Sequence, residues 1–350
     1  MNLYNDEKYM EDICYVANLQ LPWDKLKNKS VMISGASGLI GSFLIDVILE
    51  KNNIDNLNCT VYALGRNIEK IKSRFSKHTN NSNLIYIQYD VRQSLMFNNI
   101  NNIDYILHLA SNTHPLLYAT DPIGTITTNI IGLQNMLEFA TQCNTSRFLF
   151  ASSNEIYGEN RGDVELFDED YSGYINCNTL RAGYPESKRC GEALCQAYKT
   201  QKNLDVTIAR ITRSYGPTMN MSDTKAVSQF IKNGITKKDI VLKSAGNQYY
   251  SYTYMADAVS GLLYILLKGQ NGEAYNIADE NSDITLKDLA SIVAQNCNTK
   301  VVYEQPDINE AIGYSKATKA RLKGQKLHDL GWSPKYDIES GIERTINILT

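Results

Sequence analysis

Between residues 29 and 215, apolar and polar positions alternate in two ways. Short apolar runs predict buried strands, and the stretches between them, with apolar residues every three or four positions, predict amphipathic helices. The predicted strands are 30–34, 60–64, 84–89, 104–109, 147–152 and 206–210, and the predicted helices are 38–51, 69–76, 121–143 and 184–201. This order is typical of an α/β fold with a doubly wound parallel sheet, in which ligands bind at the carboxyl ends of the strands.

The predicted helix 121–143 carries an apolar stripe, which we expect to be buried against the sheet. The stripe consists of Ile126, Ile130, Leu133, Met136, Leu137 and Phe139.

The two ends of the chain do not follow this alternation. Residues 1–28 predict a helical extension that ends in a turn at Leu21-Pro22-Trp23, and residues 29–215 predict the dinucleotide-binding Rossmann domain. After Gly216-Pro217 we expect a helix at 223–234, a strand at 240–243, a helix at 286–295 and an amphipathic helix at the C-terminus. Residues 249–254 alternate as a strand does. We therefore predict a smaller C-terminal substrate-binding lobe over residues 216–350, with a segment around 250–278 returning to the Rossmann domain.

Composition narrows the class of protein. Of the 350 residues 43% are apolar and 21% are charged, and the net charge is −3, so neither a nucleic-acid partner nor a membrane surface is expected. Seven scattered cysteines without CxxC spacing indicate reduced thiols, a cytoplasmic location and no metal site.

A glycine-rich turn follows the first predicted strand and opens a helix. Its residues are Gly35-Ala36-Ser37-Gly38-Leu39-Ile40-Gly41. Glycines let the backbone approach a pyrophosphate, and a helix N-terminus offers free amides, so we expect Gly35, Ser37, Gly38, Leu39, Ile40 and Gly41 to bind a dinucleotide. A tight turn with no ligand is the alternative.

The end of the second strand bears on the choice of dinucleotide. There the chain reads Gly65-Arg66-Asn67, with no carboxylate for the ribose hydroxyls of NAD. Arg66 suits a 2′-phosphate, which favours NADP; if Arg66 is only a solvated surface residue, the cofactor is NAD. The remaining expected cofactor contacts are Asn67, Asp90 and Val91 beside the adenine, and Leu109, Ala110 and Ser111 beneath the cofactor.

Candidate catalytic residues lie on the fifth strand and the helix after it. In a helix, Tyr184 and Lys188 share one face, and the ammonium favours the phenolate, so the tyrosine can move protons. That spacing alone is weak, because it also occurs at Tyr4/Lys8. Upstream, Ser153 can hydrogen-bond the substrate oxygen that Tyr184 deprotonates, and Glu155 can act as an acid or base at a neighbouring carbon.

Together, the glycine turn, SSNEIYG (152–158), YPESK (184–188) and RITRSYGP (210–217) resemble the extended short-chain dehydrogenase/reductase family of nucleotide-sugar-modifying enzymes. Within it the motifs look most like UDP-glucuronate decarboxylases, and next like 4,6-dehydratases. The resemblance implies a bound nicotinamide cofactor that oxidises C4 of a sugar through Tyr184, Lys188 and Ser153, with Glu155 in the position of an acid/base carboxylate. It also implies a homodimer built from helices 121–143 and 184–201.

Four positions depart from the family pattern and are the candidates for substrate contact. Thr218 and Tyr250 stand where the decarboxylases carry arginines, Arg213 stands where they carry asparagine, and Asn154 stands where the dehydratases carry aspartate. Either the substrate has changed, or the phosphate-binding cations have moved to Arg213 or Lys225 with the activity kept.

Three functions are compatible with these residues. The first is an NAD(P)-dependent decarboxylase, dehydratase or epimerase of a sugar nucleotide. The second is a net NADP(H)-dependent reductase or dehydrogenase of a sugar phosphate or activated polyol precursor, which Arg66 would favour. The third, a cofactor-binding protein without catalysis, conflicts with the complete set Ser153, Tyr184 and Lys188.

Overall fold

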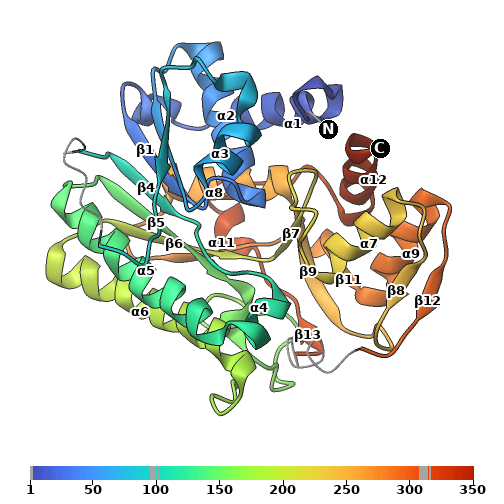
Figure 1. The fold of residues 1–350 in the computed structure, drawn as a ribbon. Coiled ribbons are helices and arrows are strands. Elements are labelled where there is room, and N and C mark those ends of the chain that lie inside the picture. The colour runs from blue at the N-terminus through green and yellow to red at the C-terminus, as the bar shows by residue number, and fades with distance from the viewer. Residues whose placement is uncertain (1–2, 95–99, 101, 307–313, 315–316) are drawn as a thin grey trace.

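Seven parallel strands form the central sheet of the structure, a computed structural model that describes residues 3–94, 100, 102–306, 314 and 317–350 (Figure 1). In spatial order they are β10 (Ala274–Ile277), β6 (Val206–Ile211), β5 (Arg147–Ser153), β4 (Tyr105–His108), β1 (Ser30–Ser34), β2 (Thr60–Gly65) and β3 (Leu84–Gln88). The chain moves outward from β1 to β2 and β3 and then returns to pair β4 with the other side of β1. This reversal creates a crevice at the carboxyl ends of β1 and β4, where ligands of doubly wound sheets bind.

Helices cover both faces of the sheet (Figure 1). On one face lie α4 (Pro115–Thr120), α5 (Pro122–Gln142) and α6 (Gly183–Lys202), with α5 and α6 packed side by side. On the other lie α2 (Leu39–Asp55) and α8 (Met255–Lys268), with α1 (Glu7–Ala17) outside them and α3 (Ile68–Arg74) beside β2 and β3.

The remaining elements form a smaller lobe beside the carboxyl ends of the strands (Figure 1). A four-stranded sheet contains β7 (Arg213–Tyr215), β9 (Tyr249–Tyr254), β11 (Asp283–Thr285) and β13 (Lys319–Ala320), and a two-stranded sheet contains β8 (Ile240–Leu242) and β12 (Val301–Tyr303). The helices of this part are α7 (Ala226–Ile235), α9 (Leu286–Cys297) and α12 (Ile338–Leu349), whereas α11 (Gln325–His328) packs against β10 and α8 of the main body.

Buried polar contacts tie the two ends of the chain together. Asp12 on α1 is fully buried and accepts hydrogen bonds from the hydroxyls of Tyr254 and Tyr336 and from Nε of Arg344 on α12. The N-terminal helix is therefore an integral part of the body, because an aspartate without these partners would be costly to bury.

The predicted fold class, a doubly wound parallel sheet, is confirmed, and each of the six predicted strands is present with its ends shifted by no more than one residue. The predicted strand at 249–254 is β9. The predicted helix at 223–234 begins later, at Ala226, because the Asp223 carboxylate accepts the Lys225 amide just before it. The proposed domain boundaries stay a prediction, although β10, from the predicted returning segment, lies in the central sheet.

The expected burial of the whole α5 stripe is wrong at its first member. Ile126 is 37% exposed, and the inward positions of this half of the helix belong to Thr125, Thr128 and Asn129. Asn129 hydrogen-bonds Ser187 on α6, so polar contacts hold the two helices together here. Ile130 is only half-buried, whereas Leu133, Met136, Leu137 and Phe139 are buried as expected.

Within the described ranges, no helix combines the length and the apolar character that crossing a bilayer requires.

Candidate active site

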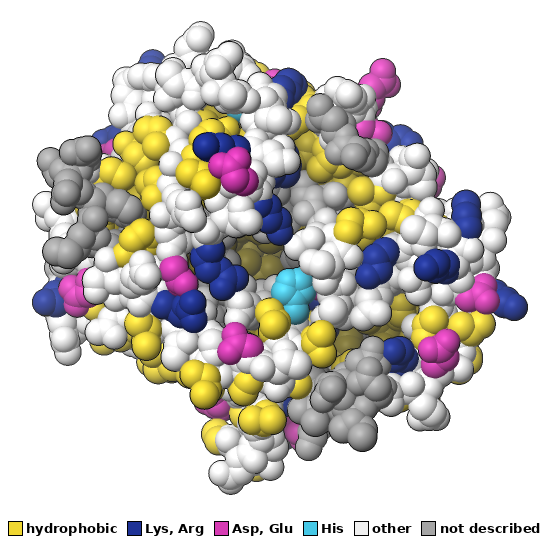
Figure 2. Space-filling view, viewed as in Figure 1, with side chains coloured by type: hydrophobic (Ala, Val, Ile, Leu, Met, Phe, Trp, Pro, Cys, Tyr) yellow, Lys and Arg dark blue, Asp and Glu magenta, His cyan; other side chains and the backbone are white. Residues whose placement is uncertain are grey.

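A cavity of about 550 Å³ follows the carboxyl ends of the central strands and extends to β8 and α7 in the smaller lobe. Figure 2 shows a hollow in this face of the molecule, with basic side chains and a histidine around it. Its volume lies in the range of small-molecule sites, roughly 300–1,000 Å³, and its lining runs from the glycine turn beside β1, past Tyr184, to α7 and β8.

The glycine-rich turn lines the end of the cavity beside β1, including Gly35, Ser37, Gly38, Leu39, Ile40 and Gly41. Gly35 has φ +75°, and a Cβ there would lie 3.0 Å from the Ala110 nitrogen; at Gly41 a Cβ would lie 2.5 Å from the Gly35 oxygen. Gly38 is the N-cap of α2 and has no capping side chain, so the first amides of this helix face the cavity free to bind an anion.

At the end of β2, Arg66 and Lys70 both line the cavity. Asn67 does not line it and instead accepts a hydrogen bond from the Lys70 amide at 2.9 Å as the N-cap of α3. Asp90 and Val91 follow β3 and line the same region; Asp90 forms a 2.6 Å ion pair with Arg92. The hydrogen bonds from Arg92 hold the pKa of the Asp90 carboxyl below its usual value.

Leu109, Ala110 and Ser111, after β4, form the floor of the cavity. The Ser34 hydroxyl accepts the amides of Leu109 and Ala110, at 3.1 and 3.2 Å. Ser111 donates to Asn129 on α5, at 2.7 Å. The backbone beneath the expected cofactor is thus fixed from β1 and from α5.

Tyr184 and Lys188 lie one turn apart on α6, and both are buried in the wall of the cavity. The Lys188 ammonium donates to the Ala151 carbonyl at 2.8 Å and lies 5.9 Å from the centroid of the Tyr184 ring. Burial lowers the pKa of Lys188 to about 7. Burial, and to a smaller extent the charge of Glu155, raises the pKa of Tyr184 to about 12. Hydrogen bonding with Ser153 lowers this pKa but does not outweigh them. Without a cofactor the proton therefore stays on the tyrosine.

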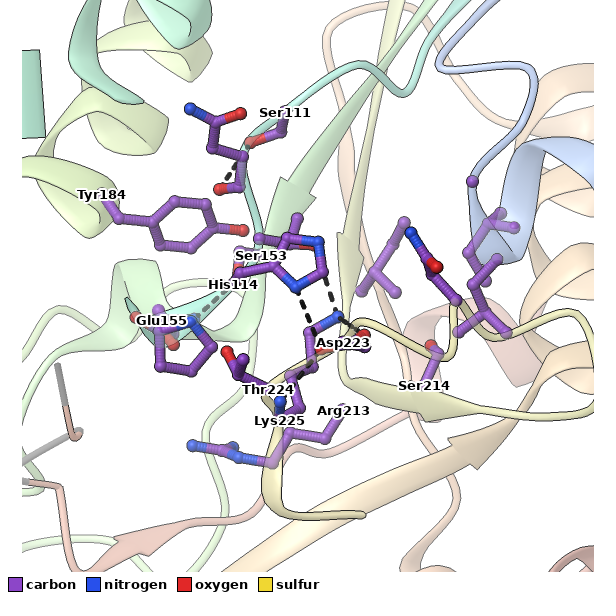
Figure 3. A pocket seen from close by; sticks show the side chains of 18 of the residues that line it. Ser111, His114, Ser153, Glu155, Tyr184, Arg213, Ser214, Asp223, Thr224 and Lys225 are labelled. Atoms are coloured by element: carbon purple, nitrogen blue, oxygen red, sulfur yellow. Dashed lines mark hydrogen bonds and ion pairs between the residues drawn. The ribbon is translucent and has the colours of Figure 1, made fainter. Parts of the chain in front are cut away.

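Ser153 and Glu155 lie opposite the Tyr184 hydroxyl (Figure 3). The Ser153 hydroxyl accepts the Glu155 amide at 3.2 Å, which orients both side chains at the end of β5. Glu155 forms a 2.5 Å ion pair with Arg181, and the buried Asn154 lines the same wall. The structure thus brings all four predicted catalytic residues to one place.

The predicted substrate residues are only partly brought together. Arg213 lines the cavity with its guanidinium carbon 3.5 Å from the centroid of the Tyr250 ring, while the Tyr250 hydroxyl donates to the Ala317 carbonyl. Buried Nη1 of Arg213 has no hydrogen-bond partner among the described residues. Thr218 lies outside the cavity and donates to the Leu39 carbonyl at 2.8 Å.

The lining residues His114 and Asp223 were not predicted from the sequence, whereas their neighbour Lys225 was predicted as a possible phosphate-binding cation. His114 and Asp223 approach to 3.2 Å, and Lys225 forms a 3.2 Å ion pair with the other oxygen of Asp223 (Figure 3). Burial would raise the pKa of Asp223, but hydrogen bonding with His114 and the charge of Lys225 outweigh it and hold that pKa well below its usual range. This cluster joins the segment after β4 to the segment before α7.

At its far end, called the slot below, the cavity is lined by apolar side chains of α7 and β8 with polar side chains beside them. Its residues are Val227, Phe230, Val241 and Leu242, with Gln229, Lys243, Ser244 and Gln248 beside them. A flat, partly polar ring fits such a slot.

No group of three or more histidine, cysteine, aspartate or glutamate side chains suited to a metal ion occurs in the described part of the chain.

Comparison with known proteins decides the family. The model of the NAD dependent epimerase/dehydratase family matches residues 31–278. The chain belongs to this family. The predicted extended short-chain dehydrogenase/reductase membership, the predicted enzyme class and the dependence on a nicotinamide dinucleotide are confirmed.

Relatives and solved structures agree with this assignment. UDP-glucuronic acid decarboxylase 5 of Arabidopsis thaliana is 31% identical over 90% of this chain and 87% of its own length. UDP-glucuronic acid decarboxylase 1 of Xenopus tropicalis is 31% identical over 91% of this chain and 72% of its own length. Two solved structures share the fold, each with a TM-score of 0.78. The dTDP-glucose 4,6-dehydratase DesIV of Streptomyces venezuelae with NAD is 22% identical, and the match covers 91% of this chain and 96% of the DesIV chain. The UDP-glucuronic acid 4-epimerase of Bacillus cereus with UDP-glucuronic acid and NAD is 21% identical, and the match covers 91% of this chain and 98% of the epimerase chain.

Proposed function

We propose that this member of the family is a nucleotide-sugar decarboxylase that acts on a UDP-linked hexuronic acid such as UDP-glucuronic acid. The convergence of Tyr184, Ser153 and Glu155 on one end of a cavity long enough for a dinucleotide and a sugar nucleotide carries this proposal. Its relatives named as UDP-glucuronic acid decarboxylases support the choice of substrate.

Tyr184 takes the proton from the C4 hydroxyl, which Ser153 holds by a hydrogen bond. A nicotinamide dinucleotide held at the glycine turn would supply the oxidising power, as the acceptor and later the donor of the C4 hydride. The C4 ketone makes the C5 carboxylate a β-keto acid, so carbon dioxide leaves and its bonding electrons pass into an enolate. Glu155 passes a proton from water to C5 of the enolate, and Tyr184 returns its own proton to the C4 oxygen.

Arg213 is the residue that we assign to the substrate's negative charge. Its unpartnered, buried Nη1 lies at the wall that it shares with Asn154 and Glu155, so an anionic group there would gain a charge-assisted hydrogen bond. Lys225, at the N-cap of α7, is the second candidate cation, for the diphosphate. A uridine would occupy the slot between Phe230 and Val241.

For the cofactor we infer a site that accepts NADP as well as NAD. Arg66 and Lys70 are both cations at the end of β2, and the carboxylate of Asp90 nearby is neutralised by Arg92. A 2′-phosphate would meet favourable charge there.

The test is incubation with UDP-glucuronic acid and either cofactor, followed by mass spectrometry of the nucleotide sugar. A decarboxylase gives a UDP-pentose and carbon dioxide with no net change in reduced-cofactor absorbance. Steady net oxidation of NADPH with a sugar phosphate or polyol precursor would instead establish the reductase alternative. Loss of water, or only inversion at C4, would refute decarboxylation and leave a dehydratase or an epimerase.

We also propose that the enzyme is a homodimer that pairs through α5 and α6. Ile123 and Ile131 on α5 are 76% and 43% exposed, and apolar side chains on one helical surface favour association. A cytoplasmic location goes with this function and stays a prediction.

A further inference from the structure

Arg181 is a buried cation that the proposed reaction does not use. It lies in a short 3₁₀ turn, Leu180–Ala182, directly before α6, and its side chain is only 12% exposed. The guanidinium forms the 2.5 Å ion pair with Glu155. It lines the cavity that contains Tyr184, three residues further along the chain.

A stack of three planar groups connects Arg181 to Tyr184. The guanidinium carbon of Arg181 lies 4.6 Å from the centroid of the Tyr118 ring. The Tyr118 ring in turn stacks on the Tyr184 ring, with centroids 4.8 Å apart and planes 26° apart. Tyr118 is buried, so it fixes the distance between the cation and the reactive tyrosine. Arg181 thus contacts one acid/base group directly and the other through a single ring.

The contacts of Arg181 bear on the repulsion between the negative charges of Glu155 and of ionised Tyr184. Glu155 and Tyr184 share a small buried space, and a carboxylate beside a forming phenolate disfavours it. Lys188 is the cation expected to compensate, but it is buried against the Phe150 ring and the Ala151 carbonyl, and burial lowers its pKa to about 7. An arginine keeps its charge throughout this pH range.

We propose that Arg181 is a positioning residue that keeps the two acid/base groups independent: it neutralises Glu155 beside Tyr184 and, through Tyr118, holds the Tyr184 ring in place. This inference rests on the proposed roles of Tyr184 and Glu155. The charge of Arg181 lowers the pKa of Tyr184 and that of Glu155 raises it, in agreement with the geometry.

The groups around Tyr184 come from five parts of the chain. They are Lys188 on α6, Ser153 and Glu155 at the end of β5, Arg181 before α6, Tyr118 and His114 at α4, and Asp223 with Lys225 before α7. Arg181 and Glu155 form an ion pair with each other, and Asp223 pairs separately with Lys225, so Arg181 and Glu155 are a matched pair for substitution.

The first experiment follows the rate of C4 oxidation against pH with UDP-glucuronic acid. In the pH–rate profile, the limb set by the ionisation of Tyr184 should move to higher pH in Arg181→Gln, by about one pH unit. Glu155→Gln should move it to lower pH, and the double variant should lie between them. Arg181→Lys keeps the charge and should keep the limb near its wild-type position even if the rate falls. Tyr118→Phe keeps the ring but removes a hydroxyl whose hydrogen bonding lowers the pKa of Tyr184, so it should move the limb to higher pH by less than Arg181→Gln does.

A second experiment does not need turnover. In the NAD-bound protein, labelled with carbon-13 at tyrosine Cζ, the Tyr184 resonance is identified as the one lost in Tyr184→Phe. Its titration should move in the directions given above in the same variants. If the wild type does not turn over UDP-glucuronic acid, the proposed function fails while this titration still decides the role of Arg181. An unchanged titration in Arg181→Gln, or an equal shift in Arg181→Lys, would overturn the inference, because both results would mean that the charge of Arg181 is not what acts on Tyr184.

Discussion

At the scale of single residues, the chemistry depends on how burial shifts protons between Tyr184 and Lys188. Burial lowers the pKa of the lysine to about 7 and raises that of the tyrosine to about 12, so the two shifts oppose an ionised pair in the free enzyme. A positively charged nicotinamide ring beside the phenol would favour the phenolate. We therefore expect the tyrosine to become an effective base only when the dinucleotide is bound.

Replacing Tyr184 with phenylalanine tests its role. The ring stacks on Tyr118, and phenylalanine preserves that packing while it removes the hydroxyl, so the fold should remain and turnover should fall by at least about 10²–10⁴-fold. The measurement is steady-state product formation, with circular dichroism to check the fold. Tyr198→Phe, on the same helix but hydrogen-bonded to Glu138, is the control and should stay close to wild type. Comparable activity in both variants would remove Tyr184 from the mechanism.

Arg66 decides the choice between the two dinucleotides. Its removal in Arg66→Ala should weaken NADP binding by about tenfold, the value of a lost charge-assisted contact, and should leave NAD binding nearly unchanged. Isothermal titration with each dinucleotide measures this. Lys72→Ala removes a cation from α3 that lies outside the cavity and should affect neither. An equal loss for both dinucleotides in Arg66→Ala would contradict a 2′-phosphate contact.

Sequence reasoning found those site residues that lie in contiguous motifs. The glycine turn, the Ser153–Glu155 stretch and the Tyr184–Lys188 pair line one cavity as expected, because each follows a strand end or shares a helix face. Tyr118 and His114 were missed, since their relation to the site exists only through contacts across space. Arg181 lies three residues before Tyr184, but no sequence pattern indicates that it forms an ion pair with Glu155.

At the scale of elements, one buried carboxylate connects α8 to the turn before α12. Asp257 in the first turn of α8 accepts the amides of Lys335 and Tyr336, at 2.8 and 3.0 Å. Burial, with smaller contributions from Asp279 and Asp12, nevertheless raises the pKa of Asp257 to about 7. The carboxyl is thus protonated in the folded protein at pH values where it is ionised in the unfolded chain.

This raised pKa predicts a pH-dependent stability. Because the folded state holds the proton and the unfolded state does not, Asp257 stabilises the fold at about pH 4, and that contribution is lost as the pH rises through about 7. Between pH 5 and pH 8 the free energy of unfolding should decrease by less in Asp257→Asn than in the wild type. The difference between the two decreases should be on the order of 1–3 kcal/mol. Urea unfolding at several pH values measures it. The exposed Asp24→Asn should keep the wild-type slope, and an unchanged slope in Asp257→Asn would show that the carboxyl is ionised throughout.

The elements themselves were predictable where a clear period exists. Strands β1 to β6 and the long helices α5 and α6 have apolar runs or stripes of sufficient length. Strands β7, β11 and β13 have three, three and two residues, too short for a period, and pair with β9 from distant parts of the chain. Likewise, the seventh strand, β10, pairs with β6 across more than sixty residues, so no local signal fixes its place.

At the scale of the whole molecule, the dimer prediction depends on α5 and α6, which lie side by side on one outer face of the sheet (Figure 1). Ile123, Ile126 and Ile131 give the exposed surface of α5 an apolar character, and the exposed Ala193 extends it on α6. Two such pairs related by a two-fold axis would bury this surface in a four-helix contact. None of these three isoleucines lines the active-site cavity, so both sites of such a dimer would remain accessible.

Charges placed on that surface should therefore separate the subunits. In the double variant Ile123→Glu/Ile131→Glu, like charges from two copies would meet at the contact and lose hydration, and we expect the mass in solution to fall from that of a dimer to that of a monomer. Light scattering coupled to size-exclusion chromatography measures the mass. Ile54→Glu changes an isoleucine of similar exposure, 40%, on α2 at the opposite face, and should leave the dimer intact. A wild type that is already monomeric, or a dimer that withstands both glutamates, would exclude this interface.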